Sequence, residues 1–256
     1  MIWMSTPAAA QSGGFDAHGF RFASATGDLR APLEFVRPGS LSAPGGSIGL
    51  LGEYASRPLV FELDGERTIP LKNVVAVNLV GGFAPIDRVQ VDVGLPVYLT
   101  ATRPQDVVGP VAGDVRASLL VEAVRPSDAG GFGLGVNASI EAPTGAPAWY
   151  LGTFGTAGSI ALTSTLEVEH TTFSWTAGAR LAPNTALADR PAPTRGGDTV
   201  EASASLAQLA TDTVGVGVEA HLSFPIDGDV RAGIGVPATS LASVRWQVAP
   251  PVTVVG

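Results

Sequence analysis

The sequence predicts an all-β protein and, within that class, an antiparallel up-and-down transmembrane β-barrel. Three observations lead to this fold. Apolar and polar residues alternate over repeated stretches, the connections between stretches are short and long in turn, and hairpins recur about every 40 to 44 residues. Alternation gives a strand one apolar and one polar face, and membrane barrels use strands of roughly 9 to 11 residues with short turns at one end and longer loops at the other. Because bacterial barrels have even strand numbers, we predict about 12 strands in the full protein, with about 10 to 11 in this chain.

The first expected strand covers residues 47–61 and is followed by a hairpin of residues 71–84 and 89–101. The second half of that hairpin reads VQVDVGLPVYLTA, in which every second residue from Val89 to Leu99 is apolar. Three further hairpins and one last strand continue this alternation. Their strands are expected at residues 114–125 and 132–142, 158–169 and 172–182, 199–210 and 213–224, and from residue 239.

Pro96 is difficult to place inside a closed barrel. Proline has no N–H to donate to a neighbouring strand, and a closed barrel has no free edge to accommodate it. We therefore expect either a bulge or local distortion at Pro96, or a position beside the seam of an incomplete barrel.

The polar face of the strands is predicted to line the lumen. Strand direction places Asp92, Glu122 and Glu167 near the short turns, and it places Arg116, Glu141 and Arg180 near the long loops. We interpret the inward charges as a salt-bridge network that fills the lumen, and the alternative is a charge-selective pore. The predicted lumen residues are Glu53, Asp92, Arg116, Glu122, Glu141, Glu167, Arg180, Glu219, His221 and Arg245.

Outward aromatic residues gather near the strand ends on the side of the short turns. Membrane barrels carry aromatic girdles at the lipid–water interface, so we expect these residues to form one. The alternative is a set of ordinary half-buried aromatic side chains. The predicted girdle consists of Phe83, Phe132, Phe173, Trp175 and Trp246.

The composition excludes several function classes. A net charge of −8 leaves no basic footprint for nucleic acid. The chain contains no cysteine and its histidines lack metal-ligand spacing, so we expect no disulfide, metal or cofactor. Charged residues make up 15% of the chain, below the roughly 25% of soluble domains, and no apolar run approaches the roughly 18 to 20 residues of a transmembrane helix.

His221 and Ser223 share one strand face and suggest a hydrolase. Residues two apart on a strand lie roughly 7 Å apart, too far for a direct hydrogen bond between these side chains. We therefore predict that the chain is not an enzyme.

We expect three segments. Residues 1–14 are interpreted as the remnant of a signal peptide, because the run AAAQ at residues 8–11 is typical of the small-residue end of a secretory signal. Residues 15–46 are expected to be a periplasmic N-terminal segment. Residues 47–256 are expected to be an outer-membrane β-barrel that is truncated at its C-terminus, since PPVTVVG begins an eleventh strand.

The chain resembles the N-terminal barrel region of OmpA-type envelope proteins of Gram-negative bacteria. The resemblance rests on FDAHGF, GLLGEYASRPLVFE, VVAVNLVGGFAPIDRVQVDVGLPVYLTA, GDVR and GGFGLGVNASIEAPTG. It implies an anchor in the cell outer membrane, with membrane lipid as partner and contact with peptidoglycan through a C-terminal domain that this chain lacks.

Two other functions stay open. One is a narrow diffusion channel or transporter for small solutes. The other, outside the membrane class, is a soluble β-sandwich or propeller that acts as a binding module.

Overall fold

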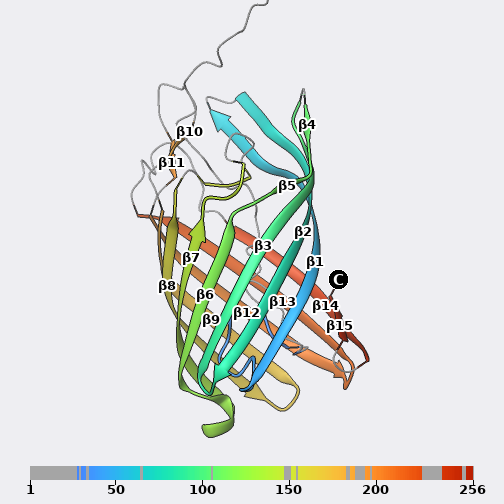
Figure 1. The fold of residues 1–256 in the computed structure, drawn as a ribbon, viewed down its shortest axis with the longest axis vertical. Coiled ribbons are helices and arrows are strands. Elements are labelled where there is room, and N and C mark those ends of the chain that lie inside the picture. The colour runs from blue at the N-terminus through green and yellow to red at the C-terminus, as the bar shows by residue number, and fades with distance from the viewer. Residues whose placement is uncertain are drawn as a thin grey trace, which may run out of the picture.

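The computed structural model of the 256-residue chain describes residues 28, 30–32, 35–63, 66–104, 106–146, 151–153, 155–182, 185–187, 194–196, 198–226, 238–249 and 252–255. They form an antiparallel sheet that curls into a half-barrel (Figure 1). The predicted all-β, antiparallel architecture is therefore confirmed. No helix within these ranges is long and apolar enough to cross a membrane.

Within the described ranges, eleven strands follow one another through the sheet in chain order, and each pairs antiparallel with the next. They are β1 (Gly45–Leu63), β2 (Glu66–Ile86), β3 (Val89–Thr102), β6 (Val115–Val124), β7 (Phe132–Ala142), β8 (Ala157–Val168), β9 (Thr171–Leu181), β12 (Thr199–Thr211), β13 (Val214–Pro225), β14 (Ala238–Ala249) and β15 (Val252–Val255). Short strands β4 (Val107–Val108) and β5 (Val111–Ala112) pair with β3, while β10 (Thr185–Leu187) and β11 (Thr194–Gly196) pair with each other. One short 3-10 helix, η1 (Pro126–Asp128), lies between β6 and β7.

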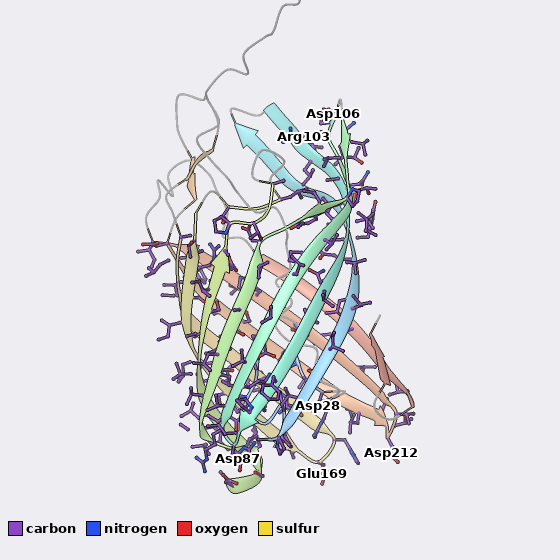
Figure 2. All side chains as sticks on the ribbon, in the orientation of Figure 1. Asp28, Asp87, Arg103, Asp106, Glu169 and Asp212 are labelled. Atoms are coloured by element: carbon purple, nitrogen blue, oxygen red, sulfur yellow. The ribbon has the colours of Figure 1, made fainter. Side chains whose placement is uncertain are left out.

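The two ends of the sheet differ as the sequence predicts. Short turns join β2 to β3, β6 to β7, β8 to β9 and β12 to β13 at one end, which we call the turn end; the opposite end is the loop end. Figure 2 shows Asp87, Glu169 and Asp212 at the turn end, and Arg103 and Asp106 at the loop end. The β1–β2 hairpin extends beyond its neighbours at the loop end (Figure 1), because these strands are 19 and 21 residues long. Both are longer than predicted.

The two faces of the sheet have inverted polarity. On one face of β6 and β7, Leu119 and Val136 are each 42% exposed, whereas Glu122 on the other face of β6 is 6% exposed. Side chains of the concave face crowd together as the sheet curls, which buries them. The buried polar residues include Asn78, Gln90, Asp92, Ser118, Glu141, Thr163, Thr165, Ser174, Arg180, Ser203, Ser205 and Glu219. The exposed apolar residues include Val91, Val93, Val121, Ile140, Ile160, Leu162, Leu166, Leu206 and Val218.

The register of β3 explains Pro96. The C=O of Pro96 accepts a hydrogen bond from Gly113 N–H at 2.8 Å. A strand residue directs its N–H and its C=O to the same side, so the N–H that proline lacks would also have faced the segment that contains Gly113. On that side the pairing with β6 ends at Gly94 and the pairing with β5 begins at Val97, so two residues of β3 lie opposite three of the partner segment. This bulge is the local distortion that the sequence predicted.

Candidate functional site in the concave face

Residues 35–41, which precede β1, cross the concave face near the turn end, and we call them the strap. Their neighbours follow the order of the strands from β8 to β2. The neighbouring pairs are Val36 with Thr163, Arg37 with Glu167, Pro38 with Gly133, Gly39 with Glu122, Ser40 with Gln90, and Leu41 with Gly82. The strap therefore bridges five strands that are far apart in the sequence.

A tight turn shapes the strap. Ser40 N–H donates to the C=O of Arg37 at 3.3 Å, and Gly39 has φ +78°. Proline at the second position and glycine with positive φ at the third are typical of a type II turn, and Arg37-Pro38-Gly39-Ser40 fits this pattern. The turn directs Gly39 N–H to Glu122 Oε1 at 2.6 Å.

Two carboxylates hold the guanidinium of Arg37. Its side chain is 1% exposed, Nη1 donates to Glu167 Oε1 at 2.5 Å, and Nη2 pairs with Asp28. Burial acts to raise the pKa of Asp28, but the charge of Arg37 and the N–H and charge of Arg30 outweigh it and hold that pKa below 3.8. The ion pair between Arg37 and Glu167 therefore holds the strap against β8.

A second set of contacts holds the strap at β3 and β6. Arg125 Nε donates to Glu122 Oε2 at 2.8 Å, and Gln90 bridges the Ser40 hydroxyl at 2.8 Å and Asp92 Oδ1 at 2.9 Å. Burial acts to lower the pKa of Arg125, but its hydrogen bond to Glu122 and the charge of that carboxylate raise it. All three carboxylates predicted near the short turns thus lie in one network with the strap.

A cavity of about 430 Å³ lies at this end. The strap, η1 and the β8–β9 turn contribute to its lining. Its charged lining residues are Asp28, Arg30, Arg37, Arg125, Glu167 and Glu169. Three cations and three anions leave it without net formal charge.

The loop end carries a separate ion pair. Arg180 Nη2 donates to Glu141 Oε2 at 2.7 Å, and both side chains are 10% exposed. Arg116 Nη2 donates weakly to Ser139 Oγ at 3.4 Å, and that oxygen lies 2.6 Å from Ser159 Oγ. Arg180 is therefore paired with a carboxylate on β7, and Arg116 lies beside the hydroxyl groups of β7 and β8.

The connection between β7 and β8 folds back at the loop end. Asp114 Oδ1 accepts Gly145 N–H at 2.8 Å, and Oδ2 accepts Thr153 N–H at 2.7 Å. Leu151, 1% exposed, packs into an apolar cluster with Leu71, Val74, Ala76, Tyr98 and Ala101 of β2 and β3. This connection covers part of the interior at the end opposite to the strap.

The other predicted lumen residues are Glu53, Glu219, His221 and Arg245. Asn78 Nδ2 is 3.5 Å from Glu53 Oε2, and Glu219 is 5% exposed. His221 Nδ1 is 2.7 Å from Ser203 Oγ on β12, so its hydroxyl partner lies on the neighbouring strand and is not Ser223. The remaining residue, Arg245, pairs in the sheet with Gly215, and its side chain lies outside the described part. Among the described residues, no group of His, Cys, Asp and Glu is arranged to hold a metal ion.

The predicted girdle residues occupy the turn-end part of the strands. Phe83, Phe132 and Phe173 are 55%, 42% and 45% exposed on the convex face. Trp175 is half-buried. Trp246 pairs in register with the first residue of β13, and its side chain lies outside the described part.

The chain matches no protein-family model and no curated protein. The resemblance to OmpA-type proteins stays a prediction from sequence phrases.

Proposed function

We propose that this chain is an outer-membrane β-barrel that acts as the structural anchor of an envelope protein. The inverted polarity of the sheet is the observation that carries this proposal. Soluble monomers rarely expose contiguous apolar patches larger than a few hundred Å², whereas a membrane barrel has an apolar outer band and a polar interior. Lipid is the solvent in which this arrangement is favourable.

Closure of the sheet is part of the proposal. Open edges do not persist in the hydrocarbon region, because unpaired backbone groups there cost several kcal/mol each. Ile48 and Leu50 of the edge strand β1 are 80% and 72% exposed, against 42% for Leu119 on an interior strand. A further strand paired with β1 would cover Ile48 and Leu50 to the extent that neighbouring strands cover Leu119.

The anchor is favoured over a channel because the described interior is occupied. The strap crosses it at the turn end, the Arg180–Glu141 pair lies near the loop end, and Leu151 packs over β2 and β3. A narrow channel for small solutes is the second candidate, and the hydroxyl-rich concave face supports it. In either function the turn end would face the periplasm, with the aromatic girdle at that interface.

Charge substitution on the convex face tests the membrane assignment. Val136→Lys places a charge at mid-strand, and in a membrane barrel it should lower the unfolding free energy in lipid vesicles by about 2 to 4 kcal/mol. The control Ser127→Lys adds the same charge at an exposed position of η1. A soluble sheet would give the opposite result: Val136→Lys would improve solubility without detergent, and neither variant would partition into vesicles.

Single-channel recording separates the two membrane functions. The anchor predicts silent reconstituted protein, and stable openings of the unmodified chain would favour the channel.

A further inference from the structure

We propose that the strap is a gate, and that its displacement opens a cation-selective passage through the turn end. This inference rests on the proposed membrane barrel and adds a latent ion-conducting activity to the anchor.

The inward-facing surface beneath the strap, which we call the acidic seat, carries carboxylates. In β3, β6 and β8, the inward charged positions near the turn end are Asp92, Glu122 and Glu167, which are all carboxylates. The first two are 1% and 6% exposed. Arg37 of the strap and Arg125 of the β6–β7 connection neutralise Glu167 and Glu122. With the strap displaced, the carboxylates would face the passage, and rings of Asp and Glu select for cations.

Hydrogen bonds and ion pairs hold the strap along its length, beside buried apolar side chains. Within the part of the chain that the structure describes, no strap residue belongs to a strand of the sheet. Its buried apolar residues are Phe35, Val36 and Pro38, of which Val36 packs against Leu120. Ion pairs and hydrogen bonds exchange readily with water, so release of the strap requires no separation of paired strands.

Hydroxyl groups line the interior from β8 to β12. Thr163, Thr165, Ser174 and Ser203 are buried on this wall. Thr172 Oγ1 and Ser205 Oγ have no hydrogen-bond partner among the described residues, so they are available to hydrated ions. Leu151 packs at the loop end over β2 and β3, on the other side of the interior.

Two variants that break the same ion pair test the gate. Arg37→Gln frees the strap and keeps all three carboxylates, so we expect openings whose reversal potential in a KCl gradient shifts towards the potassium equilibrium potential. Glu167→Gln also frees the strap but removes one carboxylate, so it should open with a smaller shift. It keeps the guanidinium and provides the same readout if Arg37→Gln does not fold. The control is Arg88→Gln, which breaks an exposed ion pair with Asp128 and should stay silent.

A reversible covalent lock shows whether the strap itself closes the passage. A Cβ at Gly133 would lie 2.9 Å from Pro38 Cβ, so a small shift reaches the roughly 3.5 to 4.5 Å of a disulfide. Thr165→Ser removes the methyl that this Cβ would meet at 2.8 Å, and the chain has no cysteine of its own. Adding Pro38→Cys, Gly133→Cys and Thr165→Ser to Arg37→Gln should abolish openings under oxidising conditions, and a reductant should restore them.

Each contrary result has a distinct meaning. Inserted and folded Arg37→Gln and Glu167→Gln proteins that stay silent would overturn the gate. Openings that persist in the oxidised lock would show that the passage does not run beneath the strap, and anion preference would overturn the acidic seat. Failure of the unmodified chain to insert into vesicles would instead overturn the membrane barrel, and it is read by vesicle flotation without any electrical recording.

Discussion

Arg37 and Glu167 lie 130 positions apart in the chain, yet Nη1 of the arginine is 2.5 Å from Oε1 of the glutamate. The arginine precedes the first strand and the glutamate lies near the end of β8. This pair connects the N-terminal segment to β8, the sixth of the eleven strands along the sheet. The ordered conformation of the strap therefore depends on a strand that the curvature of the half-barrel brings close to it.

Loss of this pair should reduce stability. Arg37→Gln leaves two carboxylates without their buried guanidinium, and hydrogen bonds to charged groups contribute about 1.5 to 3 kcal/mol each. We expect a loss of about 2 kcal/mol in the unfolding free energy, measured by urea titration in vesicles. Arg88→Gln removes a pair whose side chains are 49% and 48% exposed, and it should change stability by about 0.5 kcal/mol or less. Equal losses in the two variants would contradict the structural role of Arg37.

Acid should weaken the strap through Asp28. Its pKa in the folded protein lies below 3.8, so its contribution to stability is complete above the unfolded value and is lost as pH falls through the folded value. Asp28→Asn lacks this contribution at every pH. The difference in unfolding free energy between the original chain and Asp28→Asn should therefore be largest near neutral pH and shrink below about pH 4. A difference that grows on acidification would show that the pKa shift has the opposite sign.

Gly113 should tolerate no side chain. A Cβ there would lie 2.7 Å from both Pro96 Cγ and Tyr98 Cε2, at the bulge that accommodates Pro96. Gly113→Ala should cost about 1 to 3 kcal/mol of unfolding free energy, because packed neighbours have to move. Gly52→Ala is the matched control, since a Cβ at that position meets no atom within 4 Å. An equal response of both variants to urea would argue against close packing at the bulge.

The strands could be predicted from the sequence because their signal is local. Period-two alternation places β3, β7 and β12 to within one residue of where they lie. Strands β1 and β2 were predicted too short, β2 because Pro70 interrupts the alternation before residue 71, whereas pairing continues to Leu63 and Glu66. The bulge at Pro96 also followed from a local rule, that proline lacks a donor.

The strap was not predicted, because its partners are distant in the sequence. Arg37-Pro38-Gly39-Ser40 has the composition of an ordinary surface turn, and nothing local places it against Glu122. One signal was present. The inward charges of β3, β6 and β8 near the turn end are all acidic, and buried carboxylates require cations, which an adjacent segment has to supply. Ser203 was missed as the partner of His221 for a related reason, since that pairing depends on strand register.

The contacts of Asp114 should control the β7–β8 connection at the loop end. Oδ2 accepts Thr153 N–H at 2.7 Å, whereas Oδ1 accepts Gly145 N–H at 2.8 Å. Asp114→Asn keeps one acceptor oxygen and replaces the other with an NH₂ donor that opposes an N–H. We expect a loss of about 1 to 3 kcal/mol in local stability, seen as faster hydrogen exchange of the Thr153 amide with little change in the strands.

Asp106→Asn is the matched control for this substitution, because Asp106 is an exposed carboxylate at the same end of the sheet (Figure 2). It should leave exchange at Thr153 unchanged. If Asp114→Asn accelerated exchange throughout β6 and β7 as well, Asp114 would support the sheet as a whole. Exchange confined to the connection would show that the loop-end cover opens independently of the strap, because the two lie at opposite ends of the sheet and have no described contact with each other.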